Sequence, residues 1–279
     1  MIEIQGYNSS IKFDDECYIL NNIDFGTAGS TMSTTRGLRQ HGSFYNYSIL
    51  GSRTILLTVT LFNDGKSISK LRQNVINTLN PLDNLILHID DKYSIDCILS
   101  GTIQFNSKVK YNNDYYTELL IELFCPSPTF KEKNVRVEGF TSWDNKFEFP
   151  FSFEEVFEFA IKNESLTMNI YNNSPFEIGM QIELEFKSDV VNPMIMNINT
   201  REYIQLNGIF TNGEKVIITT YFGNKRIESS IKGNIMQMVD YSSTFMQLKR
   251  GLNTFVLEAD ENKQYIECYV KYRNEHLDI

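Results

Sequence analysis

The sequence predicts a mainly β protein made of two β-sandwich-like domains, the first of which carries a single α-helix. Short stretches of alternating apolar and polar residues recur along the chain, and turn residues separate them. The chain has 20 Phe and 15 Tyr against a single Trp, and aromatic side chains favour the pleated surface of a sheet. Its 279 residues exceed what one hydrophobic core usually serves, which favours two domains.

The first domain is expected to hold strands around one helix. Residues 53–62 alternate, so they predict a strand with one apolar face formed by Ile55, Leu57, Val59 and Leu61. Ser67 is a plausible N-cap for a helix that ends before Asn80 and Pro81. Apolar residues follow at helical spacing: Ile68, Leu71, Val75 and Leu79. This single apolar stripe indicates a helix lying on a sheet.

A hairpin and a domain boundary are expected next. Residues 85–89 and 93–99 predict two strands joined by a turn at Asp90 and Asp91, and further strands are expected near 102–110 and 115–124. Pro126 and Pro128 cannot both continue a central strand. The predicted domains are therefore residues 1–130 and residues 131–279, with the charged stretch 131–138 as a linker or a crossing strand.

The second domain is expected to be a β-sandwich. In residues 181–187 the apolar Ile182, Leu184 and Phe186 alternate with charged residues, as in a half-buried strand. Turn signals recur at short intervals, at residues 212–213, 223–224, 232–234 and 250–251. Residues 151–161 fit both helical and strand periodicity, so their structure stays open.

Composition excludes several classes of protein. The longest apolar runs are far too short to span a membrane, and the first residues lack the basic start and apolar centre of a secretory signal. The net charge is −9, and the acidic excess lies mostly in residues 140–279, which disfavours nucleic-acid binding there. The four cysteines are far apart in sequence, so buried reduced thiols are expected.

One segment departs from the acidic balance. Residues 25–63 contain no Asp or Glu but include Arg36, Arg39, His41 and Arg53. The segment is either a mildly basic loop rich in Gly, Ser and Thr or a contact surface for an acidic neighbour. On the second reading, Arg36, Arg39 and Arg53 are the candidate partner-binding residues, and Asp14, Asp15, Glu16, Asp90 and Asp91 could supply the opposite charge.

The usual signatures of catalysis and of cofactor or metal binding are weak here. Gly65, Lys66 and Ser67 follow a strand and open a helix, but a phosphate-binding loop needs an earlier glycine where Thr60 stands. His41, His88 and His276 are isolated from other metal ligands. Glu183 and Glu185 could form an inverting glycosidase pair, although strand alternation already explains them as a solvated face. No enzyme activity and no cofactor are therefore expected.

An alternative function is sugar binding. Trp143 stands near a phenylalanine-rich segment, residues 147–159, and exposed Trp side chains can stack on sugars. Alternating phenylalanines more often form a buried strand face, which leaves Trp143 as the candidate carbohydrate contact. A carbohydrate-binding β-sandwich that contacts the host cell surface is therefore the alternative to a purely structural role.

The order of motifs from Asn192 to Asp260 resembles the C-terminal domain of bacteriophage distal tail proteins (the Dit family). An Asn-Pro pair leads into a strand, and turns follow at Thr200 to Glu202 and Gly213 to Glu214. A Gly-x-Lys turn at Gly223 and the run from Ser243 to Asn253 complete the pattern. The strand, helix and hairpin of residues 53–99 and the Pro-x-Pro-x-Phe element at residues 126–130 occur in the order typical of this family.

The resemblance implies a structural role at the tail tip of a long-tailed phage. An N-terminal β domain with one helix would form a homo-hexameric ring, and a galectin-like C-terminal domain would project from it. The ring would join the tail tube protein to the tail-tip hub, and the tape-measure protein and DNA would pass through it. Such a protein is a virion component assembled in the bacterial host cytoplasm, without membrane insertion or specific nucleic-acid binding. The chain has no room for an inserted sugar-binding module, which favours a plain adaptor.

Overall fold

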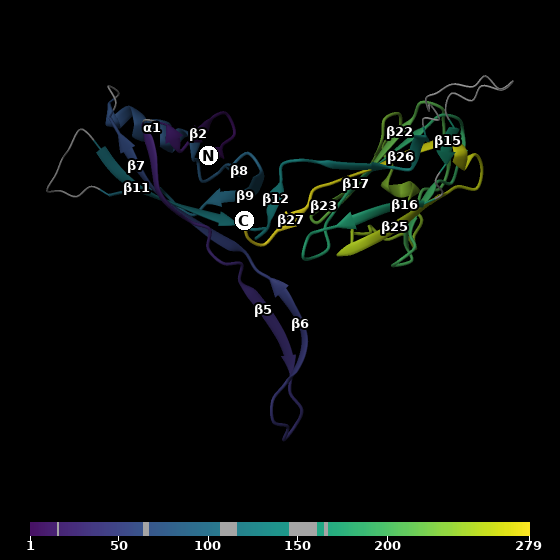
Figure 1. The fold of residues 1–279 in the computed structure, drawn as a ribbon, viewed down its shortest axis with the longest axis horizontal. Helices are drawn as coiled ribbons and strands as arrows, with labels where there is room; N and C mark the ends of the chain where they lie inside the picture. The colour runs from purple at the N-terminus through teal and green to yellow at the C-terminus, as the bar shows by residue number, and fades with distance from the viewer. Residues whose placement is uncertain (16, 64–66, 107–115, 145–160, 165–166) are drawn as a thin grey trace, which may run out of the picture. The chain divides into compact units, whose positions relative to one another are not determined.

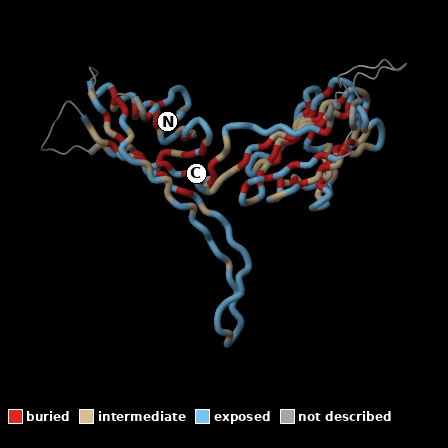
Figure 2. The backbone as a smooth tube through the Cα atoms, in the orientation of Figure 1, coloured by how far each residue is buried: buried red, intermediate tan, exposed pale blue. Residues whose placement is uncertain are grey.

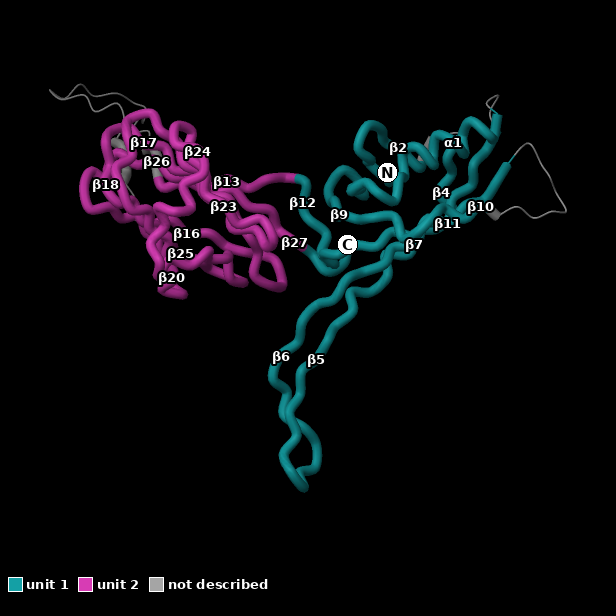
Figure 3. The backbone as a smooth tube through the Cα atoms, turned by 180° about the vertical axis from the view of Figure 1, so that it is seen from behind, with its two compact units in different colours: residues 1–133, 276–279 teal, residues 134–275 magenta. Residues whose placement is uncertain are grey.

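The computed structural model divides the chain into two compact units. It describes residues 1–15, 17–63, 67–106, 116–144, 161–164 and 167–279, with the backbone alone at 14–15, 106, 141–144 and 161–164. Unit 1 comprises Met1–Lys133 and His276–Ile279, and unit 2 comprises Asn134–Glu275 (Figure 3). The predicted division at residues 130 and 131 therefore differs from the structure, because residues 131–133 and the last four residues belong to unit 1.

Unit 1 is built on one long antiparallel sheet with a helix against it (Figure 1). The sheet has the strand order β2-β1-β8-β9-β11-β7-β4-β3, while β10 pairs with β11 and β12 pairs with β9 and β27. The elements of unit 1 are β1 (Ile2–Gln5), β2 (Ser10–Lys12), β3 (Asp14–Asp15), β4 (Tyr18–Asp24), β5 (Ser30–Thr35), β6 (Phe44–Leu50), β7 (Arg53–Phe62), α1 (Ile68–Thr78), β8 (Leu85–Ile89), β9 (Tyr93–Leu99), β10 (Gln104–Asn106), β11 (Tyr116–Cys125), β12 (Phe130–Glu132) and the short β27 (Glu275–His276), at which the chain returns to this unit.

The core of unit 1 follows the alternation of its strands. Inward positions of β7 and β11 are buried, and the Leu71, Val75 and Leu79 stripe of the helical segment joins the same cluster. The strand at 53–62, the helix and the hairpin of β8 and β9 are therefore confirmed. Ser67 does precede the helix, but its side chain forms no capping hydrogen bond.

His276, near the end of the chain, packs within unit 1. Its ring packs edge-on against Tyr93 with centroids 5.4 Å apart, and its Nε2 lies 3.1 Å from Glu132 Oε1. The polar character of the last residues hid this contact, which depends on the chain returning to unit 1.

Unit 2 is a two-layer β-sandwich. One sheet has the order β13-β26-β17-β22-β23-β24 and the other the order β16-β25-β19-β20, with β14-β15 and β18-β21 as short pairs. The elements are β13 (Arg136–Gly139), β14 (Thr141–Asp144), β15 (Ile161–Glu164), β16 (Thr167–Asn172), β17 (Gln181–Phe186), β18 (Val190–Val191), β19 (Met194–Asn197), β20 (Glu202–Gln205), β21 (Ile209–Phe210), β22 (Lys215–Tyr221), β23 (Asn224–Ser229), β24 (Gly233–Asn234), β25 (Gly251–Glu258) and β26 (Ile266–Tyr272), with single turns of 3-10 helix at Met236–Met238 and Lys263–Tyr265.

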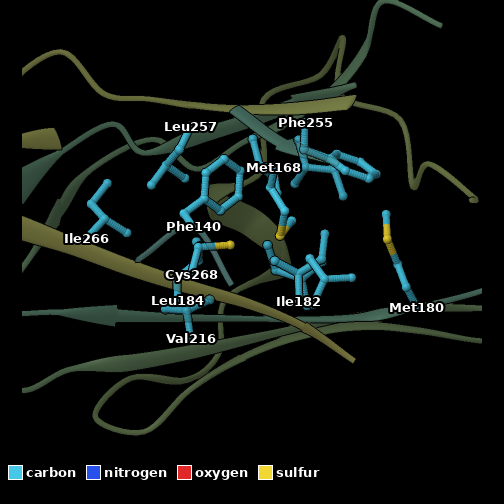
Figure 4. Packing of buried hydrophobic residues seen from close by; sticks show 14 of the residues in the cluster. Phe140, Met168, Met180, Ile182, Leu184, Val216, Phe255, Leu257, Ile266 and Cys268 are labelled. Carbon is cyan, nitrogen blue, oxygen red and sulfur yellow. The ribbon is translucent and has the colours of Figure 1, made fainter. Parts of the chain in front are cut away.

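Both sheets of unit 2 contribute to one core (Figure 4). Ile182 and Leu184 from β17 and Cys268 from β26 face Met168 from β16 and Phe255 from β25. The predicted inward face of residues 181–187 is confirmed. The mainly β fold with one α-helix in the described residues is confirmed as well. Within the described residues, no helix combines the length and the apolar character needed to cross a membrane.

Glu214 is a buried carboxylate in the turn between β21 and β22. Its side chain is fully buried and accepts hydrogen bonds from Ser229 Oγ (2.5 Å), the Thr211 amide (3.1 Å) and Lys232 Nζ (3.2 Å). Burial by itself would raise the pKa of Glu214, but these donors outweigh it and lower the pKa.

Replacing Glu214 with Gln should therefore destabilise unit 2 at neutral pH, by about 1–3 kcal/mol. Because the folded-state pKa is lowered, the stabilisation by the carboxylate is complete above the unfolded-state pKa of about 4.3 and is lost as the pH falls. The difference between wild type and Glu214→Gln should then shrink below about pH 4. Urea unfolding at about pH 7 and at about pH 3.5, one value above that pKa and one below it, would measure this difference. Glu228→Gln, at an exposed ion pair with Arg226, is the control and should change little.

Candidate functional site

The most exposed feature of unit 1 is the hairpin arm, defined as β5, β6 and their connecting residues 36–43. Among the described strands, β5 and β6 pair only with each other and form a separate two-stranded sheet. Every residue of β6 and all of β5 except Ser33 is exposed, and Figure 2 shows this exposure along the length of the arm. The register runs from Ser30 opposite Leu50 to Thr35 opposite Phe44, with an irregularity after Ser33.

The arm exposes large apolar side chains on both of its faces. Tyr45, Tyr47 and Ile49 of β6 are 56–62% exposed. Tyr47 and Ile49 share one face, whereas the register irregularity places Tyr45, opposite Thr34, on the other face. We call these three residues the β6 apolar set. The other exposed apolar residues of the arm are Met32, Leu38, Phe44 and Leu50.

An isolated two-stranded hairpin is at best marginally stable in water. The arm also exposes seven large apolar side chains, and clusters of exposed apolar side chains mark sites of protein association. The arm therefore has the properties of an interaction element whose faces another polypeptide covers.

The base of the arm is fixed to the sheet of unit 1. The Gly51 amide donates to the Gly29 carbonyl at 2.7 Å, which closes the two strands at their root. Gly26 has φ +59, and a Cβ there would lie 2.1 Å from the Thr54 carbonyl oxygen, so only glycine fits. The arm thus continues the paired strands β4 and β7.

Arg53 does not belong to an exposed contact surface, and that prediction is wrong. It is buried at the base of the arm, where its guanidinium stacks over Phe130 at 4.6 Å and donates to the Phe25 and Leu277 carbonyl oxygens. Burial lowers the pKa of Arg53, partly offset by Asp278. The Phe25 and Leu277 carbonyls come from distant parts of the sequence, so composition alone gave no sign of this internal role.

Arg36 and Arg39 do lie together at the exposed tip of the arm. Arg36 Nε donates to the Gln40 carbonyl at 3.0 Å, and Gln40 Oε1 accepts the Gly37 amide at 3.2 Å, which orders the tip. Arg39 adopts a left-handed conformation with φ 61. The tip is therefore an ordered, cationic turn, and no described residue forms an ion pair with either arginine.

The proposed acidic counterpart is only partly available. Asp90 Oδ1 lies 2.5 Å from the amino group of Met1, and Asp91 Oδ1 lies 3.4 Å from Lys133 Nζ. Because each of these two aspartates already pairs with a cation of the same chain, they are weaker candidates for a surface that binds the arm. Asp14 and Asp15 lie in β3 and Glu16 falls outside the described residues.

Sequence reasoning missed a second apolar surface, the outer face of unit 1. It lies on the outward positions of β7 and β11, where Phe62 is paired directly with Tyr116. Its members are all partly exposed, by 36–46%, and comprise Leu56, Phe62, Tyr116, Leu120 and Phe124. The available signal was large apolar residues at positions that alternation assigns to solvent.

The remaining candidates lead to no site. Glu183 and Glu185 are solvated strand carboxylates, as expected, and pair with Lys271, Lys187 and Lys215. His88 bonds to Gln5 at 2.9 Å, and the four cysteines are buried and free. The described residues contain no group of three or more potential metal ligands.

The carbohydrate alternative gains no support. Trp143 lies in β14 with only its backbone described. The segment 147–159 and the Gly65, Lys66 turn fall outside the described residues.

The motif residues from Asn192 to Asp260 turn out to hold unit 2 together. Asn192 Nδ2 donates to Asp260 at 2.6 Å, and Asn192 Oδ1 accepts the Gly208 amide at 2.7 Å. Buried Asn253 bonds the Lys249 amide and carbonyl and the Gly251 carbonyl, and so closes the turn before β25. The spacing of the motif therefore reflects side-chain clamps on the backbone of the sandwich.

Comparison with known proteins agrees with this pattern. Residues 173–276 match the family described as siphovirus-type tail component, C-terminal domain. We call this matched segment the tail component domain. The tail component domain includes the whole motif run, so the resemblance to distal tail proteins is confirmed.

The fold of the whole chain also has solved relatives. The crystal structure of SPP1 Dit (gp 19.1), described as a paradigm of the hub adsorption apparatus in phages that infect Gram-positive hosts, aligns with a TM-score of 0.70. That alignment covers 99% of each chain at 11% identity. A chain of the phage P2 baseplate in its activated conformation with Ca aligns at a TM-score of 0.56 and 9% identity, over 100% of this chain and 99% of that chain. No curated protein sequence matches the chain significantly.

Proposed function

We propose that this protein is a distal tail protein that forms a homo-hexameric ring and joins the tail tube of a long-tailed phage to its tail-tip hub. Unit 1 forms the ring, and unit 2 is a galectin-like domain at its periphery. The observation that carries the proposal is the hairpin arm, whose apolar side chains have no cover among the residues that the structure describes. The tail component domain and the fold shared with SPP1 Dit and the phage P2 baseplate support it.

The two apolar surfaces of unit 1 suit a closed ring. Head-to-tail contacts need two different complementary patches on each subunit. The hairpin arm and the outer face of unit 1 are two such patches, of different shape and on different strands. One subunit can therefore offer the arm to a neighbour while it receives contacts on another surface.

The partners that follow are further copies of the chain, the tail tube protein and the tail-tip hub. The tape-measure protein and DNA would pass through the ring without base-specific contacts. The protein would act at the tail tip of the virion after assembly in the host cytoplasm, in a structural role without catalysis.

Electron microscopy and mass photometry of the full chain, alone and with tail tube protein, test the proposal. Six-fold rings are the expected result under at least one of these conditions. Monomers alone at every concentration, with and without tail tube protein, would overturn it.

The charged tip of the arm gives a sharper prediction. Arg36→Glu with Arg39→Glu should weaken ring assembly, because reversed charges at an interface can cost several kcal/mol and a ring repeats that cost at each contact. The unfolding free energy should change by less than about 1 kcal/mol, because both arginines are exposed. Mass photometry and urea unfolding measure the two effects.

Unit 2 supplies a matched control for this charge reversal. Arg201→Glu with Arg250→Glu also reverses two exposed arginines, and Arg201 has the same φ of 61 as Arg39. This control should assemble like the wild type. Normal assembly of the Arg36 and Arg39 variant would mean that the tip is only a solvated turn.

A further inference from the structure

Cys97 and Cys125 stand directly opposite each other on neighbouring strands of unit 1. In the antiparallel pairing of β9 with β11, Leu99 is opposite Leu123 and Ile98 is opposite Phe124. The same register places Cys97 opposite Cys125, one position further along. Both side chains point into the core, since Cys97 is 2% exposed and Cys125 is fully buried.

The hydrogen-bond pattern fixes the type of pair. The Ser100 amide donates to the Glu122 carbonyl at 2.8 Å, so these opposed residues form a hydrogen-bonded pair. Pair types alternate along antiparallel strands, so Leu99 with Leu123 and Cys97 with Cys125 are both non-hydrogen-bonded. Opposed Cα atoms in such pairs are about 4.5 Å apart, which lies within the range that a disulfide spans.

The surroundings of the two thiols differ in a way that favours reaction at Cys125. Arg53 is opposite Cys125 on β7. A hydrogen bond from Cys97 lowers the pKa of Cys125, burial raises it, and the Arg53 guanidinium lowers it again, so that the pKa falls overall. The hydrogen bond with Cys125 and burial both raise the pKa of Cys97. Cys125 is therefore the sulfur that more readily becomes the nucleophilic thiolate.

We propose that Cys97 and Cys125 are an oxidation site, at which a peroxide converts the two free thiols into a disulfide that links β9 to β11. This position suits a covalent link, because the backbone pairing of β9 with β11 ends at Cys97 and Cys125. The next residue, Pro126, would be opposite Asp96, and proline has no amide proton to donate to the ladder. The covalent bond would hold the two strands together where hydrogen bonds stop.

The chemistry balances with peroxide as the oxidant. The Cys125 thiolate attacks one peroxide oxygen, the O–O bond breaks, and after proton transfer Cys125 is a sulfenic acid and water leaves. The Cys97 sulfur then attacks the Cys125 sulfur, the S–O bond breaks and a second water forms. The two thiols lose two electrons and two protons, and peroxide is reduced to two waters.

The change of redox environment that would drive this reaction rests on the proposed function. A tail protein is made in a reducing cytoplasm, where thiols stay free, and then acts in a particle outside the cell. The disulfide would form after release and stabilise the ring-forming unit.

Peptide mapping of the full-length protein tests the inference. The reduced protein is exposed to a graded series of hydrogen peroxide, unfolded in an alkylating agent and digested without reduction. The expected result is a linked peptide pair containing Cys97 and Cys125 with two hydrogens lost. Cys17 and Cys268 should remain as alkylatable as before treatment. Sulfoxide at Met32, which is 66% exposed, verifies that the oxidant acted.

Controls and a second measurement keep the test decisive. Cys268→Ser should keep the link, and Cys125→Ser should remove it. In the wild type, oxidation should slow hydrogen exchange of β9 and β11. If Cys97 and Cys125 both stay alkylatable when Met32 is oxidised, or if Cys125 reaches the sulfinic state without a link, the inference is wrong. Peptide mapping detects the disulfide whether or not rings form, so the disulfide inference can fail independently of the proposed function.

Discussion

Replacing residues 30–50 with an Asn-Gly turn should abolish self-association and leave the fold of unit 1 intact. The Gly29 carbonyl and the Gly51 amide are 2.7 Å apart, so a two-residue turn can close the shortened strands. The removed arm contributes no residue to the core of unit 1. Ring assembly should therefore be lost while the unfolding free energy of unit 1 stays within about 1 kcal/mol. Mass photometry and urea unfolding would measure both quantities.

A substitution of the β6 apolar set separates the role of apolar surface from that of the arm itself. Changing Tyr45, Tyr47 and Ile49 to Thr keeps strand propensity and removes most of the apolar area. Assembly should weaken at least about tenfold, because large aromatic side chains often dominate interface free energy.

Tyr171→Thr with Leu252→Thr is the matched control for the β6 apolar set. These residues form an exposed cross-strand pair on unit 2, with 60% and 54% exposure. The control should assemble normally. If the shortened chain still forms rings, or if the control loses them as fully as the arm variant, the arm is not the ring contact.

Arg53→Ala should be among the most destabilising single substitutions in unit 1, at about 2–4 kcal/mol. The change leaves the Phe25 and Leu277 carbonyls without their donor and empties the space beside Phe130. Arg53→Lys should recover only part of this loss, because an ammonium group cannot reproduce the planar stacking or the fork of donors. Hydrogen exchange measured across a urea series would report the two units separately.

Arg36→Ala provides the contrast, with an expected change below about 0.5 kcal/mol, because Arg36 is exposed at the tip. A combined charge reversal at Arg36, Arg39 and Arg53 would mix lost assembly with lost folding. If Arg53→Ala instead unfolds like the wild type but fails to assemble, Arg53 acts at the ring contact and its internal role is unimportant.

Local patterns in the sequence determined many elements of this protein. The alternation in β7 and β17, the apolar stripe of α1 and the turn between β8 and β9 each depend on residues within a few positions of one another. The motif run of the tail component domain was readable for the same reason, because clamps such as Asn253 bond to backbone groups nearby in the chain. Fold class and family therefore followed from short-range information.

Only the tertiary structure decided which of the remaining residues are exposed and which are buried. Tyr45 and Tyr47 lie in a strand like any other, and whether a strand face is covered depends on chain segments far away in sequence. Arg53 is internal because Phe25 and Leu277 meet at the base of the arm, and Cys97 faces Cys125 because of a strand register. Composition and periodicity describe one segment at a time, whereas burial and pairing are properties of two or more segments brought together.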